Sequence, residues 1–258
     1  FAVATGGGSV SSATATTDAN GLASTGWTLG TTAGANTLTA SSSAGSVTFS
    51  ATGTVGAATT IAIDAGDGQT GTAGAALPTD PRVLVTDSGG NAVPNETVTF
   101  TVVSGGGSVS LATVNTNASG LASVTWTLGT SVGANSLTAS LTGGAPSVTF
   151  TATGTVGPAV NIAINAGDGQ TATAGTAVAT DPQVLVTDAN GNPVSGETVT
   201  FSPTGSGVVS PASATTDANG LASVSWTLDP DATASNRLIA VITAGSVTFD
   251  ATGTVGAA

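Results

Sequence analysis

The sequence predicts an all-β protein made of tandem β-sandwich domains arranged end to end as a rod. One stretch decides the domain organisation, because Thr17–Leu29 returns as Thr116–Leu128 and again as Thr216–Leu228. A repeat of roughly 100 residues is too long for a solenoid coil and has the size of a domain with its own core. Thr, Val, Ala and Gly dominate, and apolar residues alternate with hydroxyl residues, which is typical of β structure.

The complete middle repeat is expected to contain seven or eight short strands. Turn-forming residues separate the expected strands, which lie near 59–63, 71–76, 82–87, 97–103, 108–116, 121–128, 136–141 and 147–155. This number of strands in one domain fits an immunoglobulin-like (Ig-like) sandwich of two packed sheets. With no cysteine in the chain, the core must hold by packing alone.

The period of two within these strands identifies the core. Phe100 faces inward in the fourth expected strand, Trp126 in the sixth and Phe150 in the eighth, each between outward Thr or Ser residues. The segment Asn117–Gly120 before the sixth strand is expected to form a hairpin turn. Each repeat should hold one Trp and two Phe, and the expected core anchors are Trp27, Trp126, Trp226, Phe100, Phe150, Phe201 and Phe249.

Alignment of the repeats predicts domains at 1–56, 57–156 and 157–258. The first is partial, since Phe1 aligns with Phe100 and the strands expected before Phe100 have no counterpart. Two accounts of this partial domain stay open. Residues upstream of the given sequence complete it, or a neighbouring copy donates strands and builds a head-to-tail filament. The linkers between repeats are too short for flexible tethers, which predicts a fixed angle between neighbouring domains.

Charge excludes two classes of partner. The net charge is −12, and Arg82 and Arg237 are the two basic residues of the chain. Binding to nucleic acid or to an anionic membrane surface requires clustered Lys and Arg, so neither is expected. The long uncharged runs alternate in polarity, and we expect no insertion into a membrane by this segment.

Catalysis is not expected. The chain has no His, Cys, Lys or Tyr, which removes most general bases and covalent nucleophiles. Glu96 and Glu197 occupy the same position in successive repeats and should lie a domain length apart, too far for a pair of glycosidase carboxylates. No cofactor is expected to be required.

Calcium is the one candidate metal ion. Aspartates recur in loops that a sandwich could bring towards a domain junction, and carboxylate and carbonyl oxygens are the ligands that Ca²⁺ prefers. The alternative is that Asp, Asn and Gly form turns with Asx hydrogen bonds, which the absence of a full EF-hand-like spacing favours. The candidate calcium ligands are Asp67, Asp80, Asp87, Asp168, Asp181 and Asp188.

Motifs recurring in the same order resemble a known family. The pattern GDGQTATAGTAV…VLVTDANGNPVSGETVTF…TTDANGLASVSWTL…GSVTFDATG runs from Gly167 to Gly253, and the middle repeat carries its equivalent. It resembles the bacterial Ig-like domains of the intimin/invasin type, found as tandem repeats in large surface adhesins. The resemblance implies an extracellular location on a bacterial surface or in a secreted fibre.

Two functions follow from this resemblance. The favoured one is a structural stalk or spacer that acts by its length and stiffness, with neighbouring Ig-like repeats as its partners. The alternative is an adhesin module that binds a carbohydrate or a protein receptor, of unknown identity, through exposed loops or a sheet face. An exposed aromatic or basic patch would favour the alternative.

Overall fold

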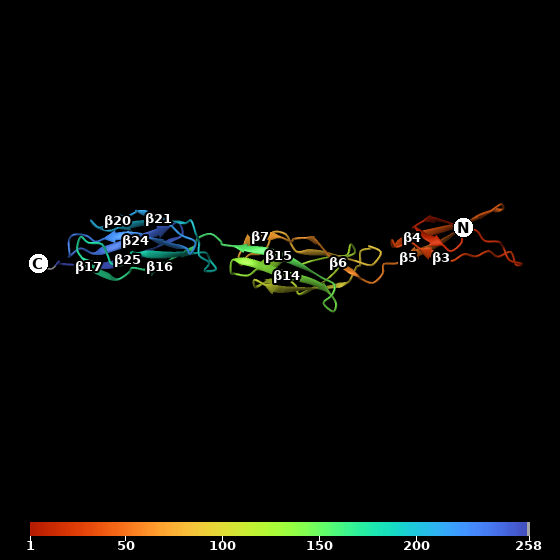
Figure 1. Ribbon diagram of the computed structural model, residues 1–258, viewed down its shortest axis with the longest axis horizontal. Helices are drawn as coiled ribbons and strands as arrows, with labels where there is room; N and C mark the ends of the chain where they lie inside the picture. Colours follow the sequence, from red (N-terminus) through yellow and green to blue (C-terminus); the bar gives the residue numbers. More distant parts are fainter. Residues whose placement is uncertain (257–258) are drawn as a thin grey trace. The chain divides into compact units, whose positions relative to one another are not determined.

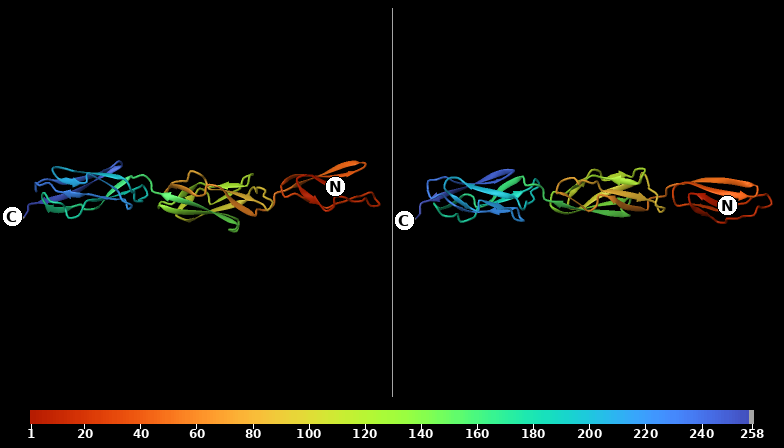
Figure 2. Two further views of the ribbon diagram at one scale, coloured as in Figure 1. Left: turned by 45° about the horizontal axis from the view of Figure 1, so that its top comes forward. Right: turned by 90° about the horizontal axis from the view of Figure 1, so that it is seen from above.

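The computed structural model describes residues 1–256, which form strands joined by loops (Figure 1). Two further views show the same strands from other sides (Figure 2). Within the described residues, no helix long and apolar enough to cross a membrane occurs. The prediction of an all-β fold is confirmed.

Contacts divide the chain into two compact units. Unit 1 holds residues 1–69, 76–127 and 135–152, and unit 2 holds residues 70–75, 128–134 and 153–258. The sheets fall into three sets along the sequence, and the division between the units runs through the middle set. The boundaries at 1–56, 57–156 and 157–258 therefore stay a prediction.

The first set consists of two small sheets in unit 1. Their strands are β1 (Ala2–Thr5), β2 (Gly8–Val10), β3 (Trp27–Leu29), β4 (Gly34–Ser42) and β5 (Gly45–Gly53). The order of one sheet is β1-β4-β5, and β2 pairs with β3 in the other. All of these pairings are antiparallel, and only β4 and β5 are joined by a short connection.

The middle set has ten strands in three sheets. They are β6 (Thr60–Ala65), β7 (Gln69–Thr72), β8 (Arg82–Thr86), β9 (Thr97–Ser104), β10 (Gly107–Val109), β11 (Thr113–Asn115), β12 (Leu121–Ser123), β13 (Trp126–Leu128), β14 (Gly133–Leu141) and β15 (Ser147–Thr155). A three-stranded sheet has the order β12-β8-β6 and a five-stranded sheet the order β11-β9-β14-β15-β7. The remaining pair is β10-β13.

The third set repeats this topology in unit 2. Its strands are β16 (Asn161–Ala166), β17 (Gln170–Thr173), β18 (Gln183–Thr187), β19 (Thr198–Pro203), β20 (Val208–Ser210), β21 (Ser213–Thr215), β22 (Leu221–Ser223), β23 (Ser225–Thr227), β24 (Asn236–Ile242) and β25 (Gly245–Thr254). The sheets are β16-β18-β22, β17-β25-β24-β19-β21 and β20-β23. Strand β17 runs parallel to β25, and the other neighbouring strands of this set are antiparallel.

Two expected strands are each divided between two sheets. The expected strand 121–128 consists of β12, which pairs with β8, and β13, which pairs with β10. The expected strand 108–116 is likewise divided into β10 and β11. The prediction of single strands was wrong because apolar and polar residues keep alternating while the chain crosses from one sheet to the other.

The turn Asn117–Gly120 links a strand of the five-stranded sheet to a strand of the three-stranded sheet and does not close a hairpin. It follows β11, which pairs with β9, and precedes β12, which pairs with β8. The Asn117 Oδ1 atom accepts hydrogen bonds from the Ser119 and Leu121 N–H groups at 2.9 and 3.1 Å. The predicted turn chemistry is present, but the predicted hairpin was wrong because the two flanking strands belong to different sheets.

The expected aromatic anchors differ between the first set and the other two. In the middle and third sets the six aromatic side chains are buried, and they are Trp126, Trp226, Phe100, Phe150, Phe201 and Phe249. Trp27 is half-buried. Phe49, which aligns with the fully buried Phe150, is 49% exposed. The first set has no counterpart of β6 and β8, whose Ile61, Val83 and Val85 are buried in the middle core.

Candidate functional site: the turns at Asp87 and Asp188

Two turns of the same pattern follow β8 and β18. The first junction turn, Asp87–Asn91, reads DSGGN, and the second junction turn, Asp188–Asn192, reads DANGN. In each, the N–H of the aspartate donates to the carbonyl of the asparagine, at 3.0 and 2.9 Å. The glycine before the asparagine has φ of 83° in both turns, a conformation that other residues rarely adopt.

The Asp87 carboxylate is surrounded by N–H donors, although only 6% of the residue is exposed. Oδ1 accepts from the Gly89 and Asn91 N–H groups at 2.8 and 2.9 Å. Oδ2 accepts from the Gly56 N–H, in the linker between β5 and β6, at 2.8 Å. The Asn91 Nδ2 group donates to both oxygens, at 3.1 and 2.9 Å. The side chain therefore fixes its own turn and also the linker.

Asp188 repeats this arrangement in unit 2. Its Oδ1 accepts from the Asn190 and Asn192 N–H groups, both at 2.9 Å. Its Oδ2 accepts from the N–H of Gly157, in the linker between β15 and β16, at 3.0 Å. The Asn192 Nδ2 group donates to Oδ1 and Oδ2 at 3.2 and 3.0 Å. The same set of hydrogen bonds therefore occurs twice, 101 residues apart.

These donors lower the pKa of both carboxyl groups from the ordinary value of 3.8 to about 2. At Asp87 the largest cause is the Asn91 side-chain amide, followed by the Gly56 N–H. At Asp188 burial is the largest influence and alone would raise the pKa, but the Asn192 amide and the Gly157 and Asn192 N–H groups together outweigh it. Both groups are therefore charged at neutral pH.

The asparagines of the turns also bind the preceding set of sheets. In unit 1, Asn91 Nδ2 donates to the Thr31 carbonyl at 2.8 Å, and Asn91 Oδ1 accepts from the Ala33 N–H at 2.8 Å. In unit 2, Asn192 Nδ2 donates to the Thr130 carbonyl at 2.9 Å. Thr31 and Thr130 occupy the same position in two loops, between β3 and β4 and between β13 and β14.

The other candidate calcium ligands lie in separate places. Asp67 Oδ1 accepts from the Thr151 N–H and hydroxyl at 2.7 and 3.0 Å, and the backbone bond is the largest cause of its lowered pKa. Asp168 Oδ1 accepts from the Asp250 N–H at 2.8 Å. Asp80 and Asp181 are exposed residues before β8 and β18. Within residues 1–256, no three acidic side chains lie close enough together to hold a metal ion. Calcium binding stays a prediction, and the hydrogen bonds favour the turn-forming alternative.

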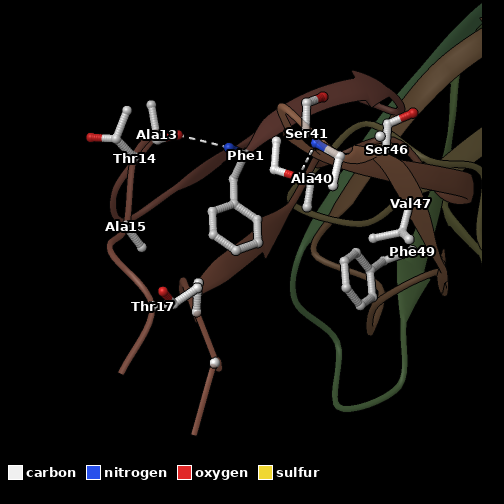
Figure 3. A pocket seen from close by; sticks show the side chains of 15 residues that line it. Phe1, Ala13, Thr14, Ala15, Thr17, Ala40, Ser41, Ser46, Val47 and Phe49 are labelled. Atoms are coloured by element: carbon white, nitrogen blue, oxygen red, sulfur yellow. Dashed lines mark hydrogen bonds between the residues drawn. The ribbon is translucent and has the colours of Figure 1, made fainter. Parts of the chain in front are cut away.

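The open side of the first set is a hollow of about 620 Å³. Phe1, Val47 and Phe49 line it together with small residues such as Ala15 and Ala23. Figure 3 shows the Phe1 and Phe49 side chains at this hollow, with the Phe1 amino group hydrogen-bonded to the Ala13 carbonyl at 2.7 Å. The hollow holds no buried charged group, and its lining offers shape and apolar surface rather than catalytic chemistry.

Comparison with protein families identifies the third set of sheets. Residues 165–256 match the model of the bacterial Ig-like domain, group 1. This segment is a bacterial Ig-like domain. The resemblance predicted from the motifs between Gly167 and Gly253 is confirmed. The middle set carries the same motifs and the same sheet topology as this bacterial Ig-like domain.

Solved structures that are similar to this chain include three bacterial proteins. The adhesin FdeC of Escherichia coli aligns over 93% of this chain and 81% of its own, with 18% identity and a TM-score of 0.50. The adhesin InvE of Yersinia pseudotuberculosis aligns over 76% of this chain and 59% of its own, with 21% identity and a TM-score of 0.38. Invasin, a bacterial integrin-binding protein, aligns over 76% and 39%, with 19% identity and a TM-score of 0.37. A comparison with curated protein sequences gave no significant match.

Sequence reasoning found the aspartates of the junction turns but missed their asparagines. Asp87 and Asp188 were singled out as oxygen ligands, whereas the structure shows them as acceptors for N–H groups. Asn91 and Asn192 stand at the same position of the D-x-x-G-N pattern in the middle and third repeats. That recurrence was the available signal.

Proposed function

We propose that the chain is a structural spacer of an extracellular bacterial surface adhesin or filament, which acts by its length and stiffness. Two findings support the adhesin context. The third set of sheets is a bacterial Ig-like domain, and the fold resembles that of FdeC, which is an adhesin. This proposal needs no catalytic group and no cofactor, in agreement with the lack of His, Cys, Lys and Tyr.

The observation that carries the spacer proposal is the attachment of both linkers to the turns that follow them. Between β15, which ends at Thr155, and β16, which begins at Asn161, the Gly157 N–H donates to Asp188. The Val160 N–H donates to the Thr187 carbonyl at 3.1 Å. In unit 1 the Gly56 and Thr59 N–H groups make the equivalent bonds to Asp87 and Thr86. A linker bonded at two points to the turn and strand that follow it has less freedom to bend than an unattached one.

A binding module remains the alternative, with less support from the side chains. Six of the nine aromatic residues are buried and cannot stack on a sugar. Both basic residues are engaged with acids, since Arg82 pairs with Asp64 and Arg237 with Asp250. The exposed faces of the sheets are formed largely by Thr and Ser, which are ordinary strand residues.

Binding assays separate the two functions. The fluorescently labelled chain is applied to glycan arrays and to host cells over a range of concentrations. The spacer proposal expects no saturable binding in either assay. Saturable binding that is lost when an exposed loop is substituted would replace it with the binding module.

Head-to-tail self-assembly is a finer hypothesis about partners, and the open hollow of the first set favours it. Phe49 and Val47 are 49% and 59% exposed there, and exposed apolar side chains that lie together are typical of interaction surfaces. If strands from a second copy cover the hollow, the mass measured by light scattering should rise with concentration, and Phe49→Ser should reduce the rise. A mass that stays that of a monomer at all concentrations would rule out assembly through this face.

A further inference from the structure

Strand β5 lies at the edge of its sheet, and among the strands of residues 1–256 it pairs with β4 alone. We propose that the free edge of β5 binds an extended segment with the sequence pattern Gly-Asp-Gly-Gln-Thr-x-Thr, added in parallel as a further strand. This pattern is the sequence of residues 167–173, most of which form β17. The inference goes beyond the spacer function and does not depend on it.

The third set shows what such an edge accepts. The counterpart of β5 in this set is β25, which pairs with β24 on one side and with β17 on the other. Residues Gln170–Thr173 lie in parallel register with residues 251–254. The sequence of residues 251–254 is Ala-Thr-Gly-Thr, and residues 51–54 have the same sequence. The first set therefore carries the acceptor sequence without its strand.

An aspartate and a glycine begin the parallel pairing by binding both backbone groups of one residue. Asp168 Oδ1 accepts from the Asp250 N–H at 2.8 Å, and the Gly169 N–H donates to the Asp250 carbonyl at 2.9 Å. In the middle set, the aspartate and glycine of residues 67–68 make the same two bonds to Thr151, at 2.7 and 3.0 Å. This pair of bonds thus belongs to the sequence pattern and not to one repeat.

Ser50 takes the place of Asp250 in β5. It pairs with Thr37 of β4 as Asp250 pairs with Arg237 of β24, and both strand pairs keep a regular register. Because backbone groups alternate in direction along an antiparallel strand, the N–H and carbonyl of Ser50 and of Thr52 point away from β4. Both residues are exposed. The edge of β5 therefore presents the same groups that hold the added strand in the third set.

The apolar side of the segment also suits the first set. Ala172 of β17 packs against the core of the third set, to which Phe249 belongs. Phe49, at the position of Phe249, is 49% exposed and borders the hollow (Figure 3). A strand added in the same register would place a small side chain on the side of β5 on which Phe49 lies. This contact would remove apolar surface from water and so favour binding.

The occupant that we infer is a strand from outside this chain. Both segments with the pattern within residues 1–256 contain strands, β7 and β17, that are already paired in their own sheets. A second copy of the chain would have to release one of these strands first and lose its ladder bonds. A free segment meets no such obstacle, and an unpaired strand edge is a ready template for it.

Peptide binding tests the inference on the whole chain. The probe is a fluorescently labelled peptide with the sequence of residues 165–176, NAGDGQTATAGT, and its fluorescence anisotropy gives the affinity. Amide hydrogen exchange of the ¹⁵N-labelled chain, followed by NMR, locates the site. We expect saturable binding that slows exchange at Ser50 and Thr52. Exchange at Ala51, whose N–H faces β4, should change far less.

Two proline substitutions in β5 form a matched pair. Thr52→Pro removes an N–H from the part of the edge that corresponds to residues 251–254, whereas Thr48→Pro makes the same change on the same edge outside that part. Thr52→Pro should weaken binding by about tenfold or more, because a ladder bond is lost and the proline ring obstructs the edge. Thr48→Pro should leave the affinity unchanged. Circular dichroism confirms that both variants are folded.

A substitution in the peptide gives a test that does not depend on the folding of a variant. Asp168→Ala in the peptide removes the carboxylate that would accept the Ser50 N–H. The altered peptide should bind the unaltered chain more weakly, since one of its two starting bonds is missing.

Several results would overturn the inference. They are the absence of saturable binding at millimolar peptide, slowed exchange confined to residues outside β5, and equal affinities for the parent chain and a folded Thr52→Pro variant or for the two peptides. Slow exchange at Ser50 and Thr52 in the chain alone, together with a mass that rises with concentration, would show that a second copy occupies the edge and would also overturn it. The spacer function stands or falls separately, on the binding to glycans and host cells.

Discussion

At the scale of single residues, Asp87 and Asp188 show how a nearly buried charge is tolerated in a protein with two basic residues. Burying a carboxylate is costly unless it is paired or hydrogen-bonded. Neither group has a basic partner in the described hydrogen bonds. Each is instead surrounded by backbone N–H groups and one asparagine amide. Such N–H donors are neutral at every pH, so the pH dependence of the junction comes from the carboxylate alone.

The pKa of Asp188 leads to a prediction about acid stability. Its pKa is about 2 in the folded protein against the ordinary 3.8. A lowered pKa adds stability that is complete well above 3.8 and is lost as the pH falls towards 2. The denaturant midpoint of unfolding should therefore be flat between neutral pH and about 5 and should fall at lower pH. Asp188→Asn should lower the midpoint at neutral pH and flatten the acid part of the curve.

The control for this prediction is Asp181→Asn, which makes the same change of charge at an exposed position before β18. It should leave the acid part of the curve as steep as in the parent chain. If Asp188→Asn and the parent chain lose stability in parallel as the pH falls, the protonation of Asp188 is not the cause.

The burial of the tryptophans gives a second prediction at this scale. Trp126 is fully buried, whereas Trp27, at the same position of the first set, is half-buried. Trp126→Ala should cost about 3–5 kcal/mol of unfolding free energy, the usual range for a large core aromatic. Trp27→Ala should cost clearly less. Equal losses in denaturant titration followed by circular dichroism would contradict the difference in packing between the two sets.

At the scale of elements, the turn Asn117–Gly120 is one of the points where the chain changes sheets. Gly120 has φ of 72°, and a Cβ atom there would lie 2.6 Å from the Val85 carbonyl oxygen. Its own carbonyl accepts the Val85 N–H at 2.9 Å, so the turn cannot move away from β8 without losing that bond. The glycine is required for its conformation and for its lack of a side chain.

A pair of glycine substitutions tests this requirement. Gly143, between β14 and β15, also has a positive φ, of 88°, but a Cβ atom there would meet no neighbour. Gly143→Ala should cost about 1–2 kcal/mol from backbone strain alone. Gly120→Ala should cost more, because a steric clash is added to the same strain. A thermal unfolding scan in which Gly143→Ala is the more destabilised variant would disprove the argument from contact with β8.

The elements also show what the sequence can predict and what it cannot. Alternation correctly placed Ala122, Val124, Trp126 and Leu128 in the core, because burial depends on the face to which a side chain points. It did not show that the chain changes sheets between β12 and β13, where the Val124 N–H bonds to the Pro81 carbonyl. Pairing partners depend on residues far away in the sequence, and a local period carries no information about them.

At the candidate site too, the sequence predicted the local hydrogen bonds but not those to residues far away in the sequence. The Asp, Asn and Gly residues of these loops indicated turns with Asx hydrogen bonds, and those bonds are present at Asp87 and Asp188. The bond from Gly56 to Asp87 spans 31 residues, and the bond from Asn91 to Thr31 spans 60. Contacts of that range depend on how neighbouring repeats meet, which no single turn sequence specifies.

At the scale of the whole molecule, calcium binding can be tested through its effect on thermal stability. The oxygens of Asp87 and Asp188 accept several N–H groups each, and a calcium ion would have to displace those donors. We expect the melting temperature of metal-stripped protein to stay unchanged when millimolar calcium is added. An increase that a chelator reverses would instead show that the native state binds the ion. Magnesium at the same concentration controls for ionic strength.

The parallel pairing of β17 with β25 has a mechanical consequence. These strands lie near the start and the end of the third set, and Gln170–Thr173 pairs with Ala251–Thr254 in parallel register. Tension applied through the chain on either side would pull the two strands in opposite directions along their length. Their hydrogen bonds would then be loaded in shear, all at the same time, rather than opened one after another. A domain connected in this way should resist pulling well beyond what its equilibrium stability alone would indicate.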